Sequence, residues 1–220
     1  LALLQLLFVP FLSICPWLNP SFIGAGEIHS INGGPKDDAG QRIHVIKASS
    51  TDLWASTWSY AGRLAFPNRD VWSIDPTVLK LNGNNYVIYS TQDSGAQCLF
   101  IAYVERLSSL SLLTPFYRSQ LTSPTTVGWN VNEGPVALYR NNRTWVAFSA
   151  SLCSGTGYKL GLLEYIGGDP LNSSSWNKYS QPVLQSANGY TMAQPVEWNS
   201  DGTPRFQPPA PLSSNIPEPV

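Results

Sequence analysis

The sequence predicts an all-β fold of the propeller type, in which similar four-stranded units repeat along the chain. Aromatic residues are frequent, with 8 Trp, 10 Tyr and 8 Phe among 220 residues, and β-strands favour such side chains. After residue 26 helical periodicity is hard to find, and short apolar runs alternate with Gly, Asn, Asp, Ser and Pro. In addition, one part of the chain matches another.

Eight short runs have the composition of strands. The pair at 78–90 is a strong hairpin signal because an Asn-Gly turn separates two apolar runs. In chain order the predicted strands are 42–48, 57–62, 77–81, 86–91, 99–104, 135–139, 144–150 and 158–164.

The internal match joins residues 75–90 to residues 133–149, with Asp75 aligned to Glu133 at an offset of 58 residues. A third strand follows each copy, at 98–105 and at 158–165, and an earlier copy of that third strand lies at 42–49. Four short strands per unit at a period near 50 indicate a propeller-type repeat. Three units are recognisable, and the first is expected to lack most of its inner hairpin.

Composition excludes several classes of function. The formal net charge is -1 and there is no basic run, so nucleic acid is not an expected partner. The three cysteines have no CxxC spacing, which argues against a zinc or redox site and allows at most one disulfide. Residues 1–25 are an apolar leader or a spurious segment, and their apolar run is too short and too broken by Pro10 to span a membrane.

Asp75 and Glu133 are the strongest candidates for a functional site. Each comes just before the predicted innermost strand of its unit, and innermost strands of a propeller surround a common axis. Two carboxyl groups that meet in a partly dry cavity raise one another's pKa, which suits an acid catalyst of glycoside cleavage. The alternative is that both acids only cap turns, as Asp before Pro often does.

At these residues the chain resembles glycoside hydrolase family 43, and the resemblance covers roughly residues 26–206. The stretches "WSIDPTVLKLNGNNYVIYS" and "VNEGPVALYRNNRTWVAFSAS" resemble two acidic motifs of that family, and "GEIHSINGG" and "MAQPVEWNSDGTPRF" also read like family sequence. The resemblance implies a five-bladed β-propeller glycosidase domain at 26–206, incomplete because the first blade and part of the last are missing, and a Pro-rich tail at 207–220.

By the same resemblance, Glu133 is the general acid and Asp75 is the carboxylate that tunes its pKa and orients it. The implied activity is inverting hydrolysis of terminal α-L-arabinofuranosyl, or β-xylosyl, residues of plant hemicellulose by a secreted monomer without a cofactor. The family's general base is an Asp of the first blade, and residues 1–26 contain no Asp or Glu, so we expect activity to be impaired. The alternatives are a non-catalytic carbohydrate-binding propeller fragment and a mispredicted sequence that does not fold stably.

Two tryptophans flank the candidate site in matching places. Trp72 lies three residues before Asp75, and Trp129 lies four residues before Glu133. Their rings could bind sugar faces, or they could pack between blades. His29 and His44 lie in strand-like segments, are expected to be structural, and give no metal site. The glycosylation sequons at Asn142 and Asn172 matter only if the chain is secreted.

Overall fold

The computed structural model describes eleven parts of the chain, and all statements below concern them. They are residues 13–14, 23–27, 42–50, 55–64, 66, 71–93, 95–104, 118–120, 131–151, 159–185 and 196–208. Within these parts the only helical element is the 3₁₀ turn η4, Ser173–Ser175, so the predicted all-β class is confirmed. We also find in them no helix whose length and hydropathy would let it cross a bilayer.

The N-terminal sheet is antiparallel with the order β1-β2-β3-β4. Its strands are β1 (Ser13–Ile14), β2 (Ile23–Glu27), β3 (Ile43–Ala48) and β4 (Trp58–Arg63). The strands β1 and β2 pair as the first two strands of this sheet. The sequence had led us to expect most of this first pair to be missing. The sheet therefore takes in part of the segment that we interpreted as a leader or as spurious.

The middle sheet is an antiparallel meander with the order β5-β6-β7-β8. Its strands are β5 (Ser73–Leu81), β6 (Asn84–Asp93), β7 (Ala96–Val104) and β8 (Arg118–Gln120). The Asn82-Gly83 turn joins β5 to β6, and both of its residues have positive φ, 53° and 78°. That is the backbone of a type I′ hairpin, as the Asn-Gly signal predicts.

The C-terminal sheet repeats this arrangement with the order β9-β10-β11-β12. Its strands are β9 (Asn132–Arg140), β10 (Arg143–Ala150), β11 (Lys159–Tyr165) and β12 (Trp176–Lys178), and β13 (Leu184–Gln185) also pairs with β11. A separate hairpin follows, formed by β14 (Glu197–Trp198) and β15 (Pro204–Arg205). All eight predicted strands are thus present, and their bounds differ from the predicted ones by a few residues.

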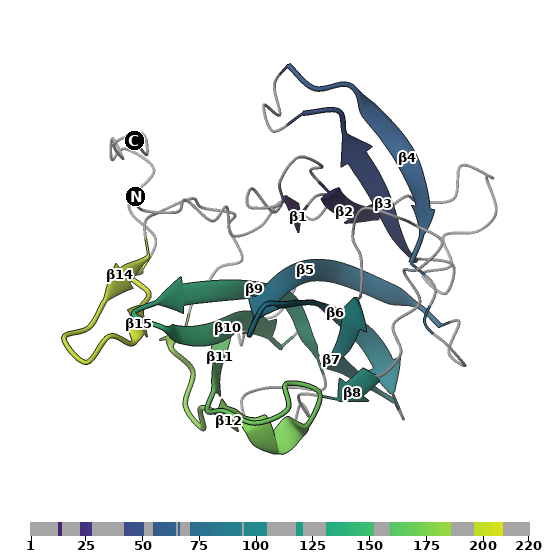
Figure 1. The fold of residues 1–220 in the computed structure, drawn as a ribbon. Helices are drawn as coiled ribbons and strands as arrows, with labels where there is room; N and C mark the ends of the chain where they lie inside the picture. Colours follow the sequence, from purple (N-terminus) through teal and green to yellow (C-terminus); the bar gives the residue numbers. More distant parts are fainter. Residues whose placement is uncertain are drawn as a thin grey trace.

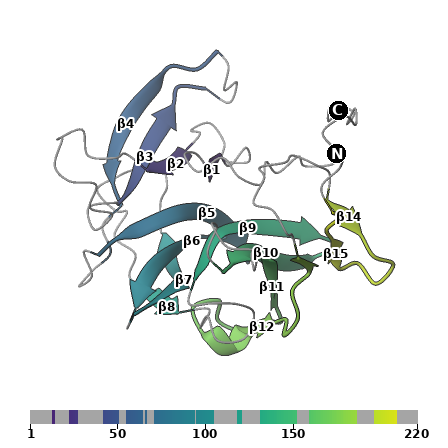
Figure 2. The same ribbon diagram turned by 180° about the vertical axis from the view of Figure 1, so that it is seen from behind.

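Three apolar layers join these sheets, and Figures 1 and 2 show the middle sheet between the other two. The first layer includes Ile43 and Val45 of β3 packed with Tyr89 and Phe100 of the middle sheet. The second layer packs the opposite face of the middle sheet, through Leu79, Ile88 and Leu99, on the C-terminal sheet. Face-to-face packing of successive four-stranded sheets is the arrangement of propeller blades.

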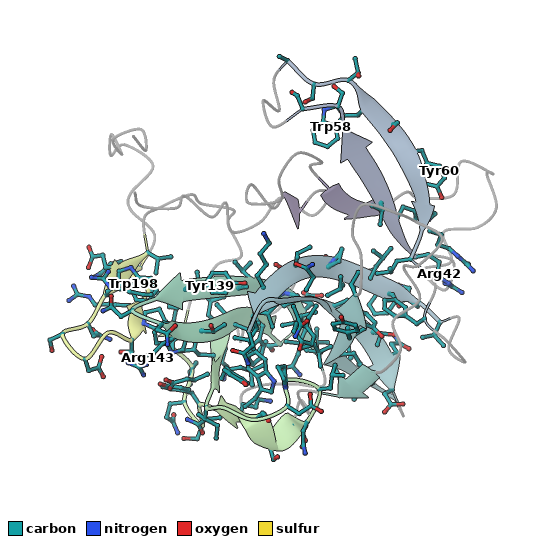
Figure 3. All side chains as sticks on the ribbon, viewed as in Figure 1. Arg42, Trp58, Tyr60, Tyr139, Arg143 and Trp198 are labelled. Carbon is teal, nitrogen blue, oxygen red and sulfur yellow. The ribbon has the colours of Figure 1, made fainter. Side chains whose placement is uncertain are left out.

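The third layer covers the far face of the C-terminal sheet. Trp198 of the β14–β15 hairpin packs at 5.5 Å between ring centroids on the buried Trp145, and Figure 3 shows Trp198 at this end of the molecule. Arg143 lies over the Trp145 ring and donates to the backbone carbonyl of Asp201 in the same hairpin. The described sheets do not close into a ring, so the blade number stays a prediction.

Candidate active site

Both innermost long strands, β5 and β9, carry a β-bulge at the same place. In each case one strand gains a residue over its partner, and a buried proline, Pro76 or Pro135, lies inside the bulge. Proline lacks a backbone N–H and is therefore suited to a place where the ladder of hydrogen bonds is interrupted. The pairs that bound the bulges are Ile74 with Ser90 and Thr77 with Ile88 in the middle sheet, and Glu133 with Ser149 and Val136 with Ala147 in the C-terminal sheet.

The bulges place Asp75 and Gly134 in the left-handed region, with φ of 49° and 56°. Asp is one of the few residues with a side chain that adopts this conformation at moderate cost, and Gly adopts it freely. Two different residues, Asp75 and Gly134, thus adopt the same backbone conformation. Each unit needs a residue that tolerates positive φ at this position of the bulge.

The strand register corrects one detail of the sequence comparison. Ser73 and Asn132 begin the two strands and pair with Thr91 and Ala150, so the units correspond at an offset of 59 residues, not 58. Asp75 therefore corresponds to Gly134. Glu133 corresponds to Ile74, one position earlier. The two acids are neighbours in the repeat rather than equivalents.

The structure nevertheless brings the two acidic segments together across the sheet boundary. The backbone N–H of Gly134 donates to Oδ2 of Asp75 at 3.0 Å, so the Asp75 carboxyl group lies against the peptide that follows Glu133. Both acidic side chains are half-buried. The two acidic segments therefore lie in contact, although the two acids do not hold equivalent positions as predicted, and their meeting at a central channel stays a prediction.

The surroundings change the acidity of both groups in the same direction. Burial raises the pKa of Glu133, the negative charge of Asp75 raises it further, and a hydrogen bond from Gln97 opposes both effects. Burial also raises the pKa of Asp75, against the opposing effect of the Gly134 N–H. A carboxyl group of raised pKa beside a second carboxyl group can hold a proton at a higher pH than an exposed glutamate, which general-acid chemistry requires.

Three further residues, which the sequence analysis did not single out, surround Glu133. Gln97 of β7 donates from Nε2 to Oε2 of Glu133 at 3.1 Å and to Oγ of Ser90 at 3.0 Å. Ser90 in turn donates to the backbone oxygen of Asn132 at 2.8 Å. Ser90 and Ser149 recur in the two copies, which was a usable signal, whereas no repeat marks Gln97.

The remaining sequence candidates have different outcomes. Trp72 is half-buried, and its backbone carbonyl accepts a hydrogen bond from Thr91, while Trp129 lies outside the described residues. His44 bonds Tyr60 through Nδ1 at 3.0 Å, and His29 lies outside the described residues. Among the residues that the structure describes, no group of three or more His, Cys, Asp or Glu side chains could hold a metal ion.

Comparison with known proteins places this geometry in context. The family description "Glycosyl hydrolases family 43" matches residues 28–192, which include both acids. An extracellular exo-alpha-(1->5)-L-arabinofuranosidase of Streptomyces chartreusis is 31% identical over 182 residues, covering 74% of this chain and 53% of that protein. The enzyme of the same name from Streptomyces avermitilis is 28% identical, covering 84% of this chain and 49% of its own length. The chain thus spans about half the length of these curated relatives.

Solved structures agree on the fold. The crystal structure of alpha-L-arabinofuranosidase from Lactobacillus brevis matches with a TM-score of 0.71 and 23% identity, over 93% of this chain and 77% of that one. The Cellvibrio cellulosa alpha-L-arabinanase matches with a TM-score of 0.57 and 14% identity, over 88% and 75%. At these identities the two likenesses bear on the fold alone.

Proposed function

The chain belongs to glycosyl hydrolase family 43, and on that premise we propose that it carries the acid side of an α-L-arabinofuranosidase-type active site. The observation that carries the proposal is the hydrogen bond between the Asp75 carboxylate and the Gly134 N–H, which joins the two acidic segments across two sheets. A pair of unlike carboxyl groups in a half-buried site is the arrangement that glycoside hydrolysis uses.

In this proposal Glu133 is the general acid that protonates the oxygen of the leaving sugar. Burial raises the pKa of Glu133, and the negative charge of Asp75 raises it further. Asp75 also holds the Glu133–Gly134 peptide by accepting the Gly134 N–H. The reaction inverts the anomeric carbon, with a third carboxylate activating water on the opposite face of the sugar. We assign that third role to no described residue.

The substrate we propose is a terminal α-L-arabinofuranosyl group, with β-xylosyl as the second choice, on plant cell-wall polysaccharide or oligosaccharide. The names of the curated relatives support arabinose and an extracellular location. Residues 26–206 would form part of a five-bladed propeller, secreted and monomeric, with the Trp72 and Trp129 rings against the sugar. The non-catalytic carbohydrate-binding fragment remains the alternative.

The test compares two kinds of leaving group. Without an acid, a sugar alcohol is a poor leaving group, whereas dinitrophenolate leaves without protonation. We therefore expect Glu133→Gln to lower kcat/KM on arabino-oligosaccharides at least about 100-fold, and to lower it far less on dinitrophenyl arabinofuranoside. Glu197→Gln on the β14–β15 hairpin is the matched control, because it removes a glutamate charge far along the chain from both bulges.

Each outcome bears on a different part of the proposal. Equal losses on the two substrates would remove Glu133 from the role of acid. Binding of arabinoxylan with no turnover by the wild-type protein, made with any flanking sequence that its gene encodes, would favour the non-catalytic alternative.

A further inference from the structure

The hydrogen bonds around Glu133 fix the direction of one side-chain amide. The amide nitrogen of Gln97 lies within hydrogen-bond distance of two oxygens, Oγ of Ser90 and Oε2 of Glu133. A glutamine amide can turn by 180° and present its oxygen instead of its nitrogen, so a network must decide which atom faces Glu133.

Ser90 fixes the orientation of the Gln97 amide. Its hydroxyl group is fully buried and has one proton, which it donates to the backbone oxygen of Asn132. The Ser90 oxygen can then only accept from Gln97, and this requires the amide nitrogen to face it. The second N–H of the same nitrogen is left for Glu133. The backbone of Gln97 is held as well, since its carbonyl accepts from Nδ2 of Asn132 and it forms an isolated parallel bridge with Val131.

The consequence for Glu133 concerns its two oxygens. The carbonyl oxygen of a carboxylic acid is a stronger hydrogen-bond acceptor than its hydroxyl oxygen. The N–H of Gln97 at Oε2 therefore favours the protonated form in which Oε2 is the carbonyl oxygen and Oε1 carries the proton. Among the described residues no hydrogen bond is found to Oε1, whereas Oε2 accepts from Gln97.

We propose that Gln97, oriented by Ser90, is a positioning residue that selects the oxygen on which Glu133 carries its proton. The inference rests on the proposed role of Glu133 as general acid. Gln97 itself touches no reacting atom. It keeps the proton on Oε1, the oxygen that does not accept from Gln97, and so gives the protonated acid one orientation.

The test removes the donor while keeping the shape of the side chain. In Gln97→Met the N–H that favours the Glu133 carboxylate is gone, so the pKa of Glu133 rises above its wild-type value. The carboxyl carbons of labelled glutamate, followed by NMR and assigned with Glu133→Gln, report this rise without any turnover. On arabino-oligosaccharide, kcat falls about tenfold because the acid loses its fixed orientation, and the alkaline limb of the pH profile moves to higher pH.

A second and a third variant separate orientation from folding. Ser90→Ala leaves the Gln97 amide free to turn and lowers kcat less than Gln97→Met does. Gln97→Glu places a like charge beside Glu133, so it raises the pKa of Glu133 even if the Met variant does not fold. Gln207→Leu is the matched control, because Gln207 makes the same kind of bond, from Nε2 to Oε2 of Glu197 at 2.8 Å, on the exposed C-terminal hairpin.

An unchanged or lowered pKa of Glu133 in a folded Gln97→Met or Gln97→Glu protein would overturn the inference. So would wild-type kcat on arabino-oligosaccharide in Gln97→Met. Failure of the proposed function appears differently, as retained acid catalysis in Glu133→Gln, and the two failures are therefore distinguishable.

Discussion

The middle and C-terminal sheets are two copies of one design that carry different side chains at the same backbone positions. Their first two strands match residue for residue at an offset of 59, including the hairpin turns Asn82-Gly83 and Asn141-Asn142, which all have positive φ. Their third strands match at an offset of 61, since Phe100 faces Tyr89 and Gly161 faces Phe148. The backbone is therefore the constant part of the repeat.

The side chains at the two bulges differ, and this difference shows how the repeat supplies two unlike carboxyl groups. The middle sheet has Ile74 followed by Asp75, and the C-terminal sheet has Glu133 followed by Gly134. Each bulge thus presents one acid, from neighbouring positions. The glycine of one copy donates its N–H to the aspartate of the other, so the two copies complete each other's site.

The largest expected effect comes from the second difference between the copies, in their cores. In the middle sheet Tyr89 and Phe100 lie side by side with ring centroids 6.1 Å apart. In the C-terminal sheet the Phe148 ring lies over Gly161, and a Cβ at position 161 would be 2.3 Å from Cζ of Phe148. We expect Gly161→Ala to lower the free energy of unfolding by about 3 kcal/mol, because the buried ring must move.

Urea denaturation measures this loss, and a second substitution identifies its cause. Phe148→Val shortens the side chain, so Gly161→Ala should cost much less in that background than in the wild type. Equal costs in the two backgrounds would mean that the ring over Gly161 does not account for the loss.

The next largest effect concerns the left-handed position in each bulge, which Gly134 and Asp75 occupy. Gly134→Ala puts a Cβ at φ 56° and is expected to lower the free energy of unfolding by about 1–2 kcal/mol. At the corresponding position Asp75→Gly relieves the backbone and should cost less than Asp75→Ala, although both remove the carboxylate that we assign to the site. Thermal unfolding of the three variants orders them. Asp75→Ala at least as stable as Asp75→Gly would contradict the argument from φ.

These positions also mark the limit of prediction from the sequence. Short apolar runs and the Asn-Gly turn predicted the long strands, because pleat periodicity and turn chemistry are local properties. The strand β2 was missed because "IGAGE" has little of the β-branched and aromatic character of a strand, and its place depends on pairing with β3. Aligning the acidic residues with each other equated Asp75 with Glu133. This alignment hid the fact that Glu133 stands one position earlier in the repeat than Asp75.

The sequence predicted the two acids of the site but not the side chain that contacts Glu133, and the reason is physical. The repeat told us that two acids meet, because equivalent strands of successive sheets lie together. The bond from Gln97 to Glu133 depends on how closely the middle sheet approaches the C-terminal sheet, and no pattern along one strand encodes that approach. Side-chain contacts across a sheet boundary belong to tertiary structure.

The smallest expected effect distinguishes two glutamates within the C-terminal sheet. Glu164 receives two hydrogen bonds from Arg143 and one from the Tyr179 hydroxyl group, so its charge is compensated. We expect Glu164→Gln to lower the free energy of unfolding at neutral pH by about 1 kcal/mol, a modest value because the Arg143 side chain is 36% exposed.

Glu133 should behave in the opposite way, because the pKa of its carboxyl group is raised in the folded protein. As pH rises past the ordinary glutamate pKa, the unfolded chain loses this proton first, and the folded state becomes less stable relative to it. The penalty is complete above the raised pKa and absent below the ordinary one. Glu133→Gln removes it, so the variant should melt higher than the wild type at pH 7 and equally at pH 3.5. A neutral-pH melting point below that of the wild type would mean that the charge of Glu133 is compensated in the folded protein, as the charge of Glu164 is. The site would then lack the strained carboxyl pair on which acid catalysis depends.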